Sequence, residues 1–397
     1  MIRNSFSRLL ASPREPSGFA DIAAPLPSTQ SRTAFNELLD LLRQLDTRYL
    51  GPDWNNQNHV AEGHRSVMHA LFTALAVVFD ADPERPVFQR SVGPTMKHTG
   101  DNADALYYVA YIRPDRSYRI RGNTAGAVYT SISLERGSDG HRSHGVARVI
   151  NDRELQAAPD GSYELILSPE PHPGHWFKLE PHVGQLQTRH YFEETYPVAA
   201  DPTKVVPLTI EPLDVPGPRP TPDDAAVAAG IRRVINYVHD ITMGMPPLLQ
   251  PERMPRWVST VPNQFNPPDK PAADLGQSAQ DAAYAQAPYA LKPDEALIIE
   301  GRFPKCAYAS VALWNHYLQT YDYVTRTTSR NRKQTTLEPD GSFRMVIAHR
   351  DPGVPNWLDT EGRTEGLIFW RFFLPEEPIA PFKTRVVRVS DLTQSGA

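Results

Sequence analysis

The sequence of 397 residues contains a single cysteine, Cys306. A disulfide framework, a clustered-thiolate zinc site and an iron–sulfur cluster each need several sulfur atoms, so the sequence excludes all three. Any metal that the protein holds must therefore be bound by histidine or carboxylate side chains.

Long apolar runs are also missing. No stretch of about eighteen consecutive apolar residues occurs, so we expect no membrane-spanning helix. Residues 1–13 include only the short apolar piece 9–11, which is too short for the core of a signal peptide. We therefore predict a cytoplasmic protein without a membrane partner.

The charge composition shows no basic excess. Lysine and arginine together number 41 against 46 aspartates and glutamates, which gives a formal charge of -5. Proteins that bind nucleic acids concentrate positive charge to neutralise phosphates, so we predict no nucleic-acid partner. The motifs of nicotinamide-dependent, nucleotide-dependent and zinc-protease enzymes and the nucleophile elbow of α/β-hydrolases are absent as well.

The chain is instead rich in proline and in short strand-like runs. Its 39 prolines are roughly twice the usual share, and from residue 105 onwards short runs of period two follow one another, as in a sandwich or barrel. Apolar residues recur at helical spacing in three segments, 32–50, 59–79 and 224–243. These patterns predict a mainly β fold with helical additions (α+β), in which an N-terminal helical pair and a central helix accompany the strands.

The two strand-rich regions resemble each other, which predicts an internal repeat. The matched pairs, about 180 residues apart, are Gly122 and Gly301, Tyr129 and Tyr308, Ser131 and Ser310, Leu134 and Leu313, Asp160 and Asp340, Trp176 and Trp357, and Arg189 and Arg371. Each copy would contain a hairpin at its Asp-Gly turn, a loop closed by tryptophan, and a strand in which arginine lies among aromatics. We predict two pseudo-repeated β-sandwich lobes that close against one another.

These patterns divide the chain into four regions. We expect an N-terminal helical region at 1–98 and the first β-sandwich repeat at 99–211. A proline-rich linker with the central helix follows at 212–295, and the second β-sandwich repeat occupies 296–397. Neither lobe needs to be stable without the other.

Two parts of the sequence resemble a known family. Residues 351–360, Asp-Pro-Gly-Val-Pro-Asn-Trp-Leu-Asp-Thr, with 361–366 and the following Trp370-Arg371, resemble the C-terminal signature of the DUF1214 family. Residues 100–108, which lead to Tyr118 and Gly122, are similar to the N-terminal part of its longer members. The resemblance implies a β-sandwich fold with helical additions. Trans-anethole oxygenases, which oxidise the side-chain alkene of propenylbenzenes, look like relatives, so it also implies a haem-dependent oxygenase acting on aromatic compounds.

Histidine is the donor that remains for haem iron in a protein with one cysteine. His190 lies in the predicted strand 185–192 directly after Arg189, and its counterpart in the second repeat is Phe372. We predict His190 as the metal ligand and Arg189 as the partner of a haem propionate, with His175 and His98 as the next candidate ligands. We assign no catalytic residue.

Structural roles are alternatives for each of these residues. His190 would be an outward-facing strand residue, His175 a surface loop residue and His98 part of a turn. Arg189 and Arg371 lie among aromatics, where a buried guanidinium needs a carboxylate or carbonyl partner. Each arginine would therefore form a structural salt bridge or clamp a ligand carboxylate.

Two other classes of function stay open beside the oxygenase. The aromatic residues of the second repeat suit an apolar or planar ligand, so the chain would be a non-enzymatic protein that binds an apolar or aromatic small molecule or a carbohydrate. A hydrolase is the third class, because carboxylates surround the Trp357 loop as glycoside hydrolysis requires: Asp351, Asp359, Glu361 and Glu365. A homo-oligomer also stays open.

Overall fold

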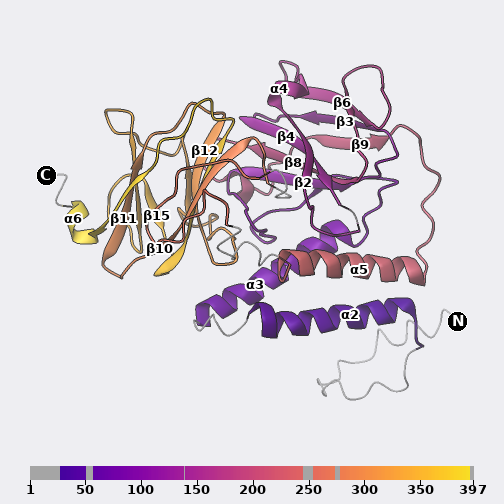
Figure 1. The fold of residues 1–397 in the computed structure, drawn as a ribbon, viewed down its shortest axis with the longest axis horizontal. Coiled ribbons are helices and arrows are strands. Elements are labelled where there is room, and N and C mark those ends of the chain that lie inside the picture. The colour runs from indigo at the N-terminus through magenta and orange to yellow at the C-terminus, as the bar shows by residue number, and fades with distance from the viewer. Residues whose placement is uncertain (1–26, 51–56, 138, 245–253, 273–277, 394–397) are drawn as a thin grey trace.

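The computed structural model describes residues 27–50, 57–137, 139–244, 254–272 and 278–393. Three helices form one layer of the molecule beneath the strands: α2 (Gln30–Gln44), α3 (Gln57–Thr73) and α5 (Asp224–Ile241) (Figure 1). Single π-helical turns, η1 (Leu45–Tyr49) and η2 (Ala74–Val78), extend α2 and α3. The N-terminal helical pair and the central helix predicted from apolar spacing are thus confirmed.

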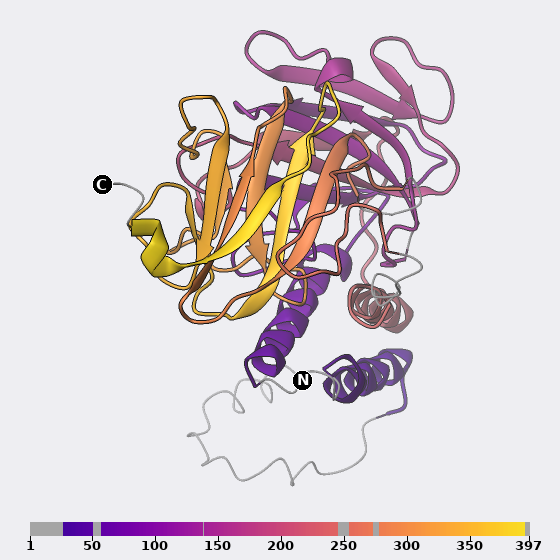
Figure 2. The ribbon, with the colours of Figure 1, turned by 60° about the vertical axis from the view of Figure 1, so that its left-hand side comes forward.

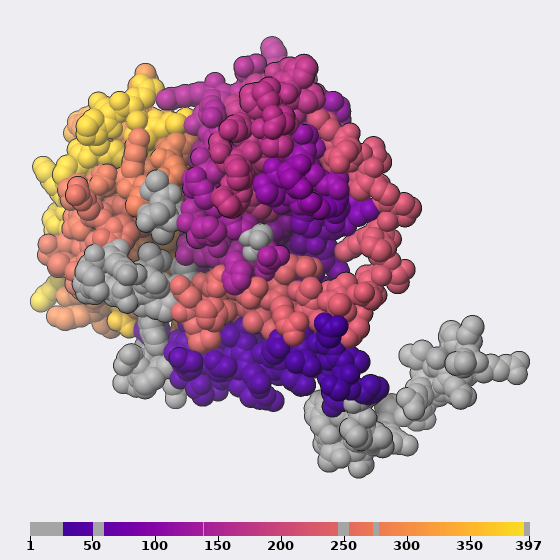
Figure 3. Space-filling model, turned by 45° about the vertical axis from the view of Figure 1, so that its right-hand side comes forward, coloured from indigo at the N-terminus to yellow at the C-terminus, as the bar shows by residue number. Residues whose placement is uncertain are grey.

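The central helix α5 holds this layer together. It contacts both α2 and α3, and its buried Val234 and Val238 belong to one apolar cluster with Leu41 of α2 and Val67 of α3. The side chain of Asp223 caps α5 by accepting a hydrogen bond from the amide of Ala226, as residues at this position commonly do. Figure 3 shows α2 and α5 lying side by side along one edge of the molecule.

The strands form two β-sandwich lobes that lie next to each other (Figures 1 and 2). The first lobe pairs a sheet of order β1-β2-β8-β4-β5 with one of order β7-β6-β3-β9, and the second pairs β10-β16-β12-β13 with β15-β14-β11-β17. The first-lobe elements are β1 (Gln89–Arg90), β2 (Ala105–Tyr111), β3 (Tyr118–Asn123), β4 (Tyr129–Arg136), β5 (Val146–Asn151), α4 (Asp152–Leu155), β6 (Ser162–Ser168), β7 (Trp176–Lys178), β8 (Val183–Tyr191), η3 (Val198–Ala200) and β9 (Leu208–Pro212). The second-lobe elements are β10 (Ala282–Ala290), β11 (Glu295–Gly301), β12 (Tyr308–Trp314), β13 (Ser329–Asn331), β14 (Phe343–Ala348), β15 (Trp357–Asp359), β16 (Glu365–Phe373), β17 (Lys383–Arg388) and α6 (Val389–Thr393).

The strand orders confirm the internal repeat. Replacing β2, β8, β4 and β5 by β10, β16, β12 and β13 reproduces the first sheet of each lobe, and the second sheets correspond in the same way. The matched tryptophans also agree in detail, because the indole of Trp176 donates to the carbonyl of Ser168 and that of Trp357 to the carbonyl of Ala348. Strand β10 begins at Ala282, so the second lobe starts before residue 296.

The Asp-Gly turns of the two lobes are also equivalent. Gly161 and Gly341 have φ angles of 83° and 81°, a left-handed conformation that glycine adopts without strain. In the first lobe the turn separates β5 from β6, which lie in different sheets. The residues next to each turn pair as in a short hairpin, which agrees with the prediction: the amide of Ala158 donates to the carbonyl of Ser162, and the amide of Glu338 donates to that of Ser342. Leu337 and Phe343 also form an antiparallel bridge across the second turn.

The two lobes meet through the faces of sheets β1-β2-β8-β4-β5 and β10-β16-β12-β13. Aromatic rings fill this interface: the ring of Tyr129 lies 4.2 Å from that of Phe373, and the ring of Tyr191 lies 4.8 Å from that of Tyr308. Tyr129 matches Tyr308 in the repeat, and β8 and β16 place Tyr191 and Phe373 at matched positions. The Tyr129–Phe373 contact in one direction therefore corresponds to the Tyr308–Tyr191 contact in the other, as expected for a pseudo-twofold axis between the lobes.

Among the helices of the described residues, none combines the length and apolar character needed to cross a membrane.

Candidate functional site

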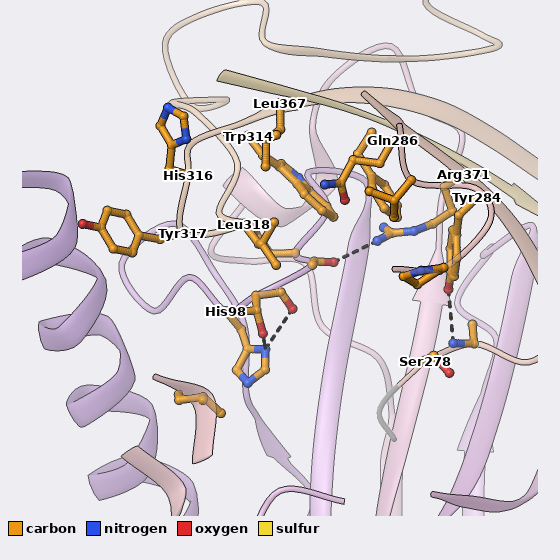
Figure 4. Close-up of a pocket in the computed structure, with 18 of the residues that line it drawn as sticks. His98, Ser278, Tyr284, Gln286, Trp314, His316, Tyr317, Leu318, Leu367 and Arg371 are labelled. Carbon is orange, nitrogen blue, oxygen red and sulfur yellow. Dashed lines mark hydrogen bonds between the residues drawn. The ribbon is translucent and has the colours of Figure 1, made fainter. Parts of the chain in front are cut away.

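A cavity of about 800 Å³ lies between the two lobes and the helical layer. Strands β2 and β8 form its first-lobe wall, and strands β10 and β16 with the end of β12 form its second-lobe wall. The segments 98–101 and 254–260 and the ends of η1 and α5 close the remaining sides. Figure 4 shows ten labelled residues of its lining. Its volume is in the range of pockets that bind small molecules.

Aromatic side chains make up much of the cavity wall. Trp314 and Phe369 stack with their ring centres 4.1 Å apart, and Trp257 meets Phe369 edge-on at 5.8 Å. Tyr107 from the first lobe and Tyr284 from the second complete this apolar surface. Flat, apolar walls of this kind favour a planar ligand.

The charged residues in the lining are mainly cationic. They are Arg48, Asp101, Arg142, Arg189 and Arg371. The carboxylate of Asp101 accepts hydrogen bonds from the amide of Thr320 at 2.8 Å and from its hydroxyl at 2.5 Å. Burial raises the pKa of Asp101, although the nearby Lys97 opposes the rise. The cavity therefore carries a positive excess.

Arg189, on β8, is held by the first lobe. Its guanidinium donates to the hydroxyl of Ser133 at 2.5 Å and to the side-chain oxygen of Gln187 at 3.2 Å. It also lies 3.8 Å from the carboxylate of Glu135, and both side chains are buried. This is the structural salt bridge that the sequence left open for Arg189.

Arg371, at the matched position on β16, is held differently. Its Nη2 donates to the carbonyl of Gly100 at 2.8 Å, but Nε and Nη1 are buried without a hydrogen-bond partner among the residues that the structure describes. No carboxylate of those residues forms an ion pair with Arg371, but the carboxyl groups of Asp101 and Asp104 are close enough for its charge to oppose the rise of their pKa values. Of the two kinds of partner that the sequence predicted, a carboxylate or a carbonyl, Arg371 has the carbonyl.

Aromatic rings, and no ion-paired carboxylate of the described residues, surround the guanidinium of Arg371. Its guanidinium carbon lies 5.1 Å from the ring centre of Phe369, 5.6 Å from that of Tyr191 and 5.8 Å from that of Tyr284. Ring faces attract a cation, yet they offer no acceptor in the plane of the guanidinium nitrogens. The side chain is only 5% exposed, so the cavity wall contains a buried positive charge that the protein satisfies only in part.

His190 points away from the cavity. Successive residues of a strand face opposite sides of a sheet, so His190 enters the interior of the first lobe while Arg189 faces the second. Its Nε2 lies 3.1 Å from the hydroxyl of Thr188 and its ring 5.9 Å from that of Tyr108. Burial lowers the pKa of His190 to about 3. His190 and Arg189 therefore cannot contact one ligand on the same face, which corrects the pairing that we predicted.

The other two predicted ligands also lie apart. His98 lines the cavity, with Nδ1 3.1 Å from the carbonyl of Thr99, and burial lowers its pKa to about 4. His175 lies before β7, and its Nδ1 is 3.3 Å from the carbonyl of Glu164 on β6. Of the four residues predicted for haem, only Arg189 and His98 line the cavity, so the set does not fit one haem site.

The carboxylates of the Trp357 loop have local partners. Asp359 pairs with Arg326 at 2.8 Å, Glu361 accepts from the amide of Asp322 at 2.6 Å, and Asp351 accepts from the amide of Gly353. None of the four candidate carboxylates is among the cavity-lining residues. This arrangement gives the hydrolase alternative no support.

Sequence reasoning missed several lining residues that the repeat could have indicated. Tyr284 lies opposite Arg371 in the sheet, as Tyr107 lies opposite Arg189. Extending the repeat upstream to β10 would have identified this tyrosine. No comparable sequence signal marks Trp257, which comes from the predicted proline-rich linker region 212–295.

Fold and cavity together define a protein of two pseudo-repeated β-sandwich lobes with a cationic, aromatic cavity between them. Residues 302–377 match the family model described as "Protein of unknown function (DUF1214)". This match covers β12–β16 and confirms the resemblance that residues 351–371 indicated.

Among solved structures, an uncharacterised protein from Burkholderia cenocepacia is similar over 91% of this chain and 99% of that chain, with a TM-score of 0.77 and 27% identity. A protein from Vibrio parahaemolyticus is 12% identical over 81% of this chain and all of that chain, with a TM-score of 0.47. No curated protein matches the chain. None of these descriptions states an activity, so the relationship to trans-anethole oxygenases stays a prediction.

Proposed function

We propose that this protein binds a small aromatic or apolar carboxylate in the cavity between its lobes. The observation that carries the proposal is Arg371, whose buried guanidinium has one hydrogen-bond partner among the described residues, the carbonyl of Gly100. The ligand's carboxylate would supply the missing counter-charge, and its apolar body would lie against the aromatic walls.

The energetics favour an anion over a neutral molecule. A buried ion costs several kcal/mol in lost hydration unless a partner compensates it, and arginine stays protonated at any ordinary pH. A carboxylate can accept two parallel hydrogen bonds from a guanidinium. Arg48 in the lining adds to the positive potential, whereas Glu135 and Asp240 lie close enough to offset the charge of Arg142.

Binding is better supported than hydrolysis. Asp101 is the one carboxylate among the described lining residues, and its hydrogen bonds with Thr320 hold it in place. A hydrolytic pair of carboxylates at the separations used in glycoside hydrolysis is therefore lacking in the described part of this cavity.

Calorimetric titration with three molecules of one shape tests the proposal. Cinnamate should bind, whereas cinnamamide and cinnamyl alcohol should bind at least about tenfold more weakly, since each lacks the charge that Arg371 needs. Arg371→Met should remove the preference for the acid. The matched control is Arg302→Met, which replaces an exposed second-lobe arginine paired with Asp340. Equal affinity for acid and amide would contradict the proposal.

Oxidation of a propenylbenzene-type alkene is the second candidate, implied by the family resemblance. Its support is the stack of Trp314 and Phe369 in the cavity wall, against which a flat aromatic molecule would lie. The test is the Soret absorbance of protein expressed with ample iron, together with turnover of trans-anethole. Protein that carries no haem and leaves the alkene unchanged would remove this candidate.

A further inference from the structure

A second group of side chains lies at the edge of the cavity, where α3 meets the second lobe. His59, His316 and Glu365 each direct one potential ligand atom to a common point, and these atoms all lie within 4.8 Å of one another. Nε2 of His59 is 3.4 Å from Oε1 of Glu365, and Nε2 of His316 is 3.9 Å from the same oxygen. The two imidazole rings are 4.2 Å apart.

The register of the second lobe brings two of these residues together. Trp314, the last residue of β12, lies opposite Leu367 on β16. The chain then turns through residues 315–319 and returns to Thr320, which bridges Trp314. His316 lies in this turn, next to the start of β16 at Glu365. Glu365 is the first residue of β16 and pairs with Ala290 of β10. The sheet therefore fixes the backbone on which the carboxylate is carried.

Contacts of α3 with the second lobe fix the third residue. The hydroxyl of Tyr317 donates to the carbonyl of His59 at 3.0 Å, and Gln319 donates to the hydroxyl of Ser66 at 3.1 Å. Glu62, one turn after His59, pairs with Arg363 at 2.5 Å. Because these contacts surround His59, its position relative to His316 and Glu365 is set by tertiary structure.

The distances suit a transition-metal ion. Two ligand atoms that are each about 2.1 Å from one ion in tetrahedral geometry are about 3.4 Å apart. The His59–Glu365 distance has this value. The His316–Glu365 distance is 3.9 Å, and the two imidazole nitrogens lie within 4.8 Å of each other, so the side chains would draw together around a bound ion. Two imidazoles and one carboxylate are a ligand set found in catalytic zinc sites and in non-haem iron sites.

We propose that His59, His316 and Glu365 form a binding site for one divalent transition-metal ion, Zn²⁺ or Fe²⁺, at the rim of the inter-lobe cavity. Three protein ligands leave at least one coordination position open. His316 also lines the cavity, and Figure 4 places it and Arg371 on opposite sides of the view, with Trp314 and Leu318 between them. The open position would thus be within reach of the cavity. This inference does not depend on carboxylate binding at Arg371.

Metal binding to the purified full-length chain tests the site. After treatment with a chelator and dialysis, the chain should bind one equivalent of Zn²⁺ in calorimetry, and Co²⁺ should give visible absorption bands of a low-symmetry site. Loss of a residue that only supports a metal ligand weakens metal binding by about ten- to hundredfold. His316→Ala and Glu365→Gln each remove a ligand, so each should raise the Kd for Zn²⁺ by more than that.

A control variant and a structural readout make the result decisive. His64→Ala removes a histidine of the same helix, α3, whose exposed imidazole contacts Asp46 instead, and it should leave Zn²⁺ binding unchanged. Circular dichroism of each metal-free variant confirms folding, and anomalous scattering at the zinc edge should locate the ion between the three side chains. Wild-type protein that binds no Zn²⁺, or that binds it equally well after Glu365→Gln and His316→Ala, would overturn the proposal and leave a hydrogen-bonded cluster.

Discussion

The matched arginines Arg189 and Arg371 should respond in opposite ways to the same substitution. They occupy equivalent positions on β8 and β16, and both are buried. Arg189 has the carboxylate of Glu135 as a partner, whereas Arg371 has a backbone carbonyl and aromatic rings. Methionine is close to arginine in length and carries no charge, so Arg189→Met and Arg371→Met form a matched pair of variants.

The expected magnitudes follow from these partners. Arg189→Met removes the guanidinium next to the buried Glu135, and breaking a buried ion pair costs about 3–5 kcal/mol. The hydrogen bond from Ser143 and the nearby charge of Arg142 remain at Glu135, so we expect a value at the lower end. Arg371→Met loses a charged hydrogen bond of about 1.5–3 kcal/mol and cation–π attraction of about 0.5–2 kcal/mol. The substitution also removes the cost of burying the charged guanidinium, which is several kcal/mol and offsets both losses.

Equilibrium unfolding in urea at pH 7 without added ligand measures the difference. We predict that Arg189→Met lowers the free energy of unfolding by about 3 kcal/mol and that Arg371→Met leaves it unchanged or raises it. Near-ultraviolet circular dichroism checks that the aromatic interface is intact in both variants. A loss at Arg371 equal to that at Arg189 would refute the reasoning, because it would mean that the protein itself compensates the charge of Arg371.

Three further outcomes follow from individual buried residues. Burial raises the pKa of Asp104 to about 7, above the unfolded value of about 3.9, so its contribution to stability is present below about pH 4 and is lost as the pH rises to about 7. As the pH rises through this interval, the free energy of unfolding of Asp104→Asn should therefore increase relative to that of wild type. Urea midpoints of the two proteins that keep a constant difference at all pH values would contradict this. His190→Ala should leave cinnamate affinity unchanged in calorimetry, since His190 faces the first-lobe interior; a loss comparable to that of Arg371→Met would place it at the site. Gly63→Ala should lower the melting temperature, because a Cβ there would overlap the Tyr317 hydroxyl; an unchanged value would mean that α3 shifts freely.

The sequence predicted the β-sandwich repeat because its evidence is internal. The matched glycines, tryptophans and arginines each mark a position with a specific conformational or packing requirement, and such requirements recur when a unit is duplicated. Arg189 and Arg371 were recognised as a pair for the same reason. The helices were also predictable, since Leu45 and Val234 belong to the apolar patterns at helical spacing and are buried in one cluster.

What the sequence did not reveal depends on tertiary contacts. His190 stood out because its counterpart is Phe372, but it lies in the core of the first lobe. Its Nε2 is next to the hydroxyl of Thr188, and its Nδ1 is buried without a hydrogen-bond partner among the described residues. Strand alternation could have separated it from Arg189 in advance. In the described residues Arg371 forms no ion pair with a carboxylate, and His59 approaches Glu365 across about 300 residues of chain. Both features arise only when α3 and the two lobes dock.

A crystal structure with a brominated acid tests the central claim most directly. Crystals of the wild-type chain soaked in 4-bromocinnamate should show an anomalous bromine peak inside the inter-lobe cavity. The carboxylate oxygens should lie about 2.7–2.9 Å from the guanidinium nitrogens of Arg371, the usual length of a charge-assisted hydrogen bond. An empty cavity at saturating ligand, or a carboxylate bound away from Arg371, would contradict the account.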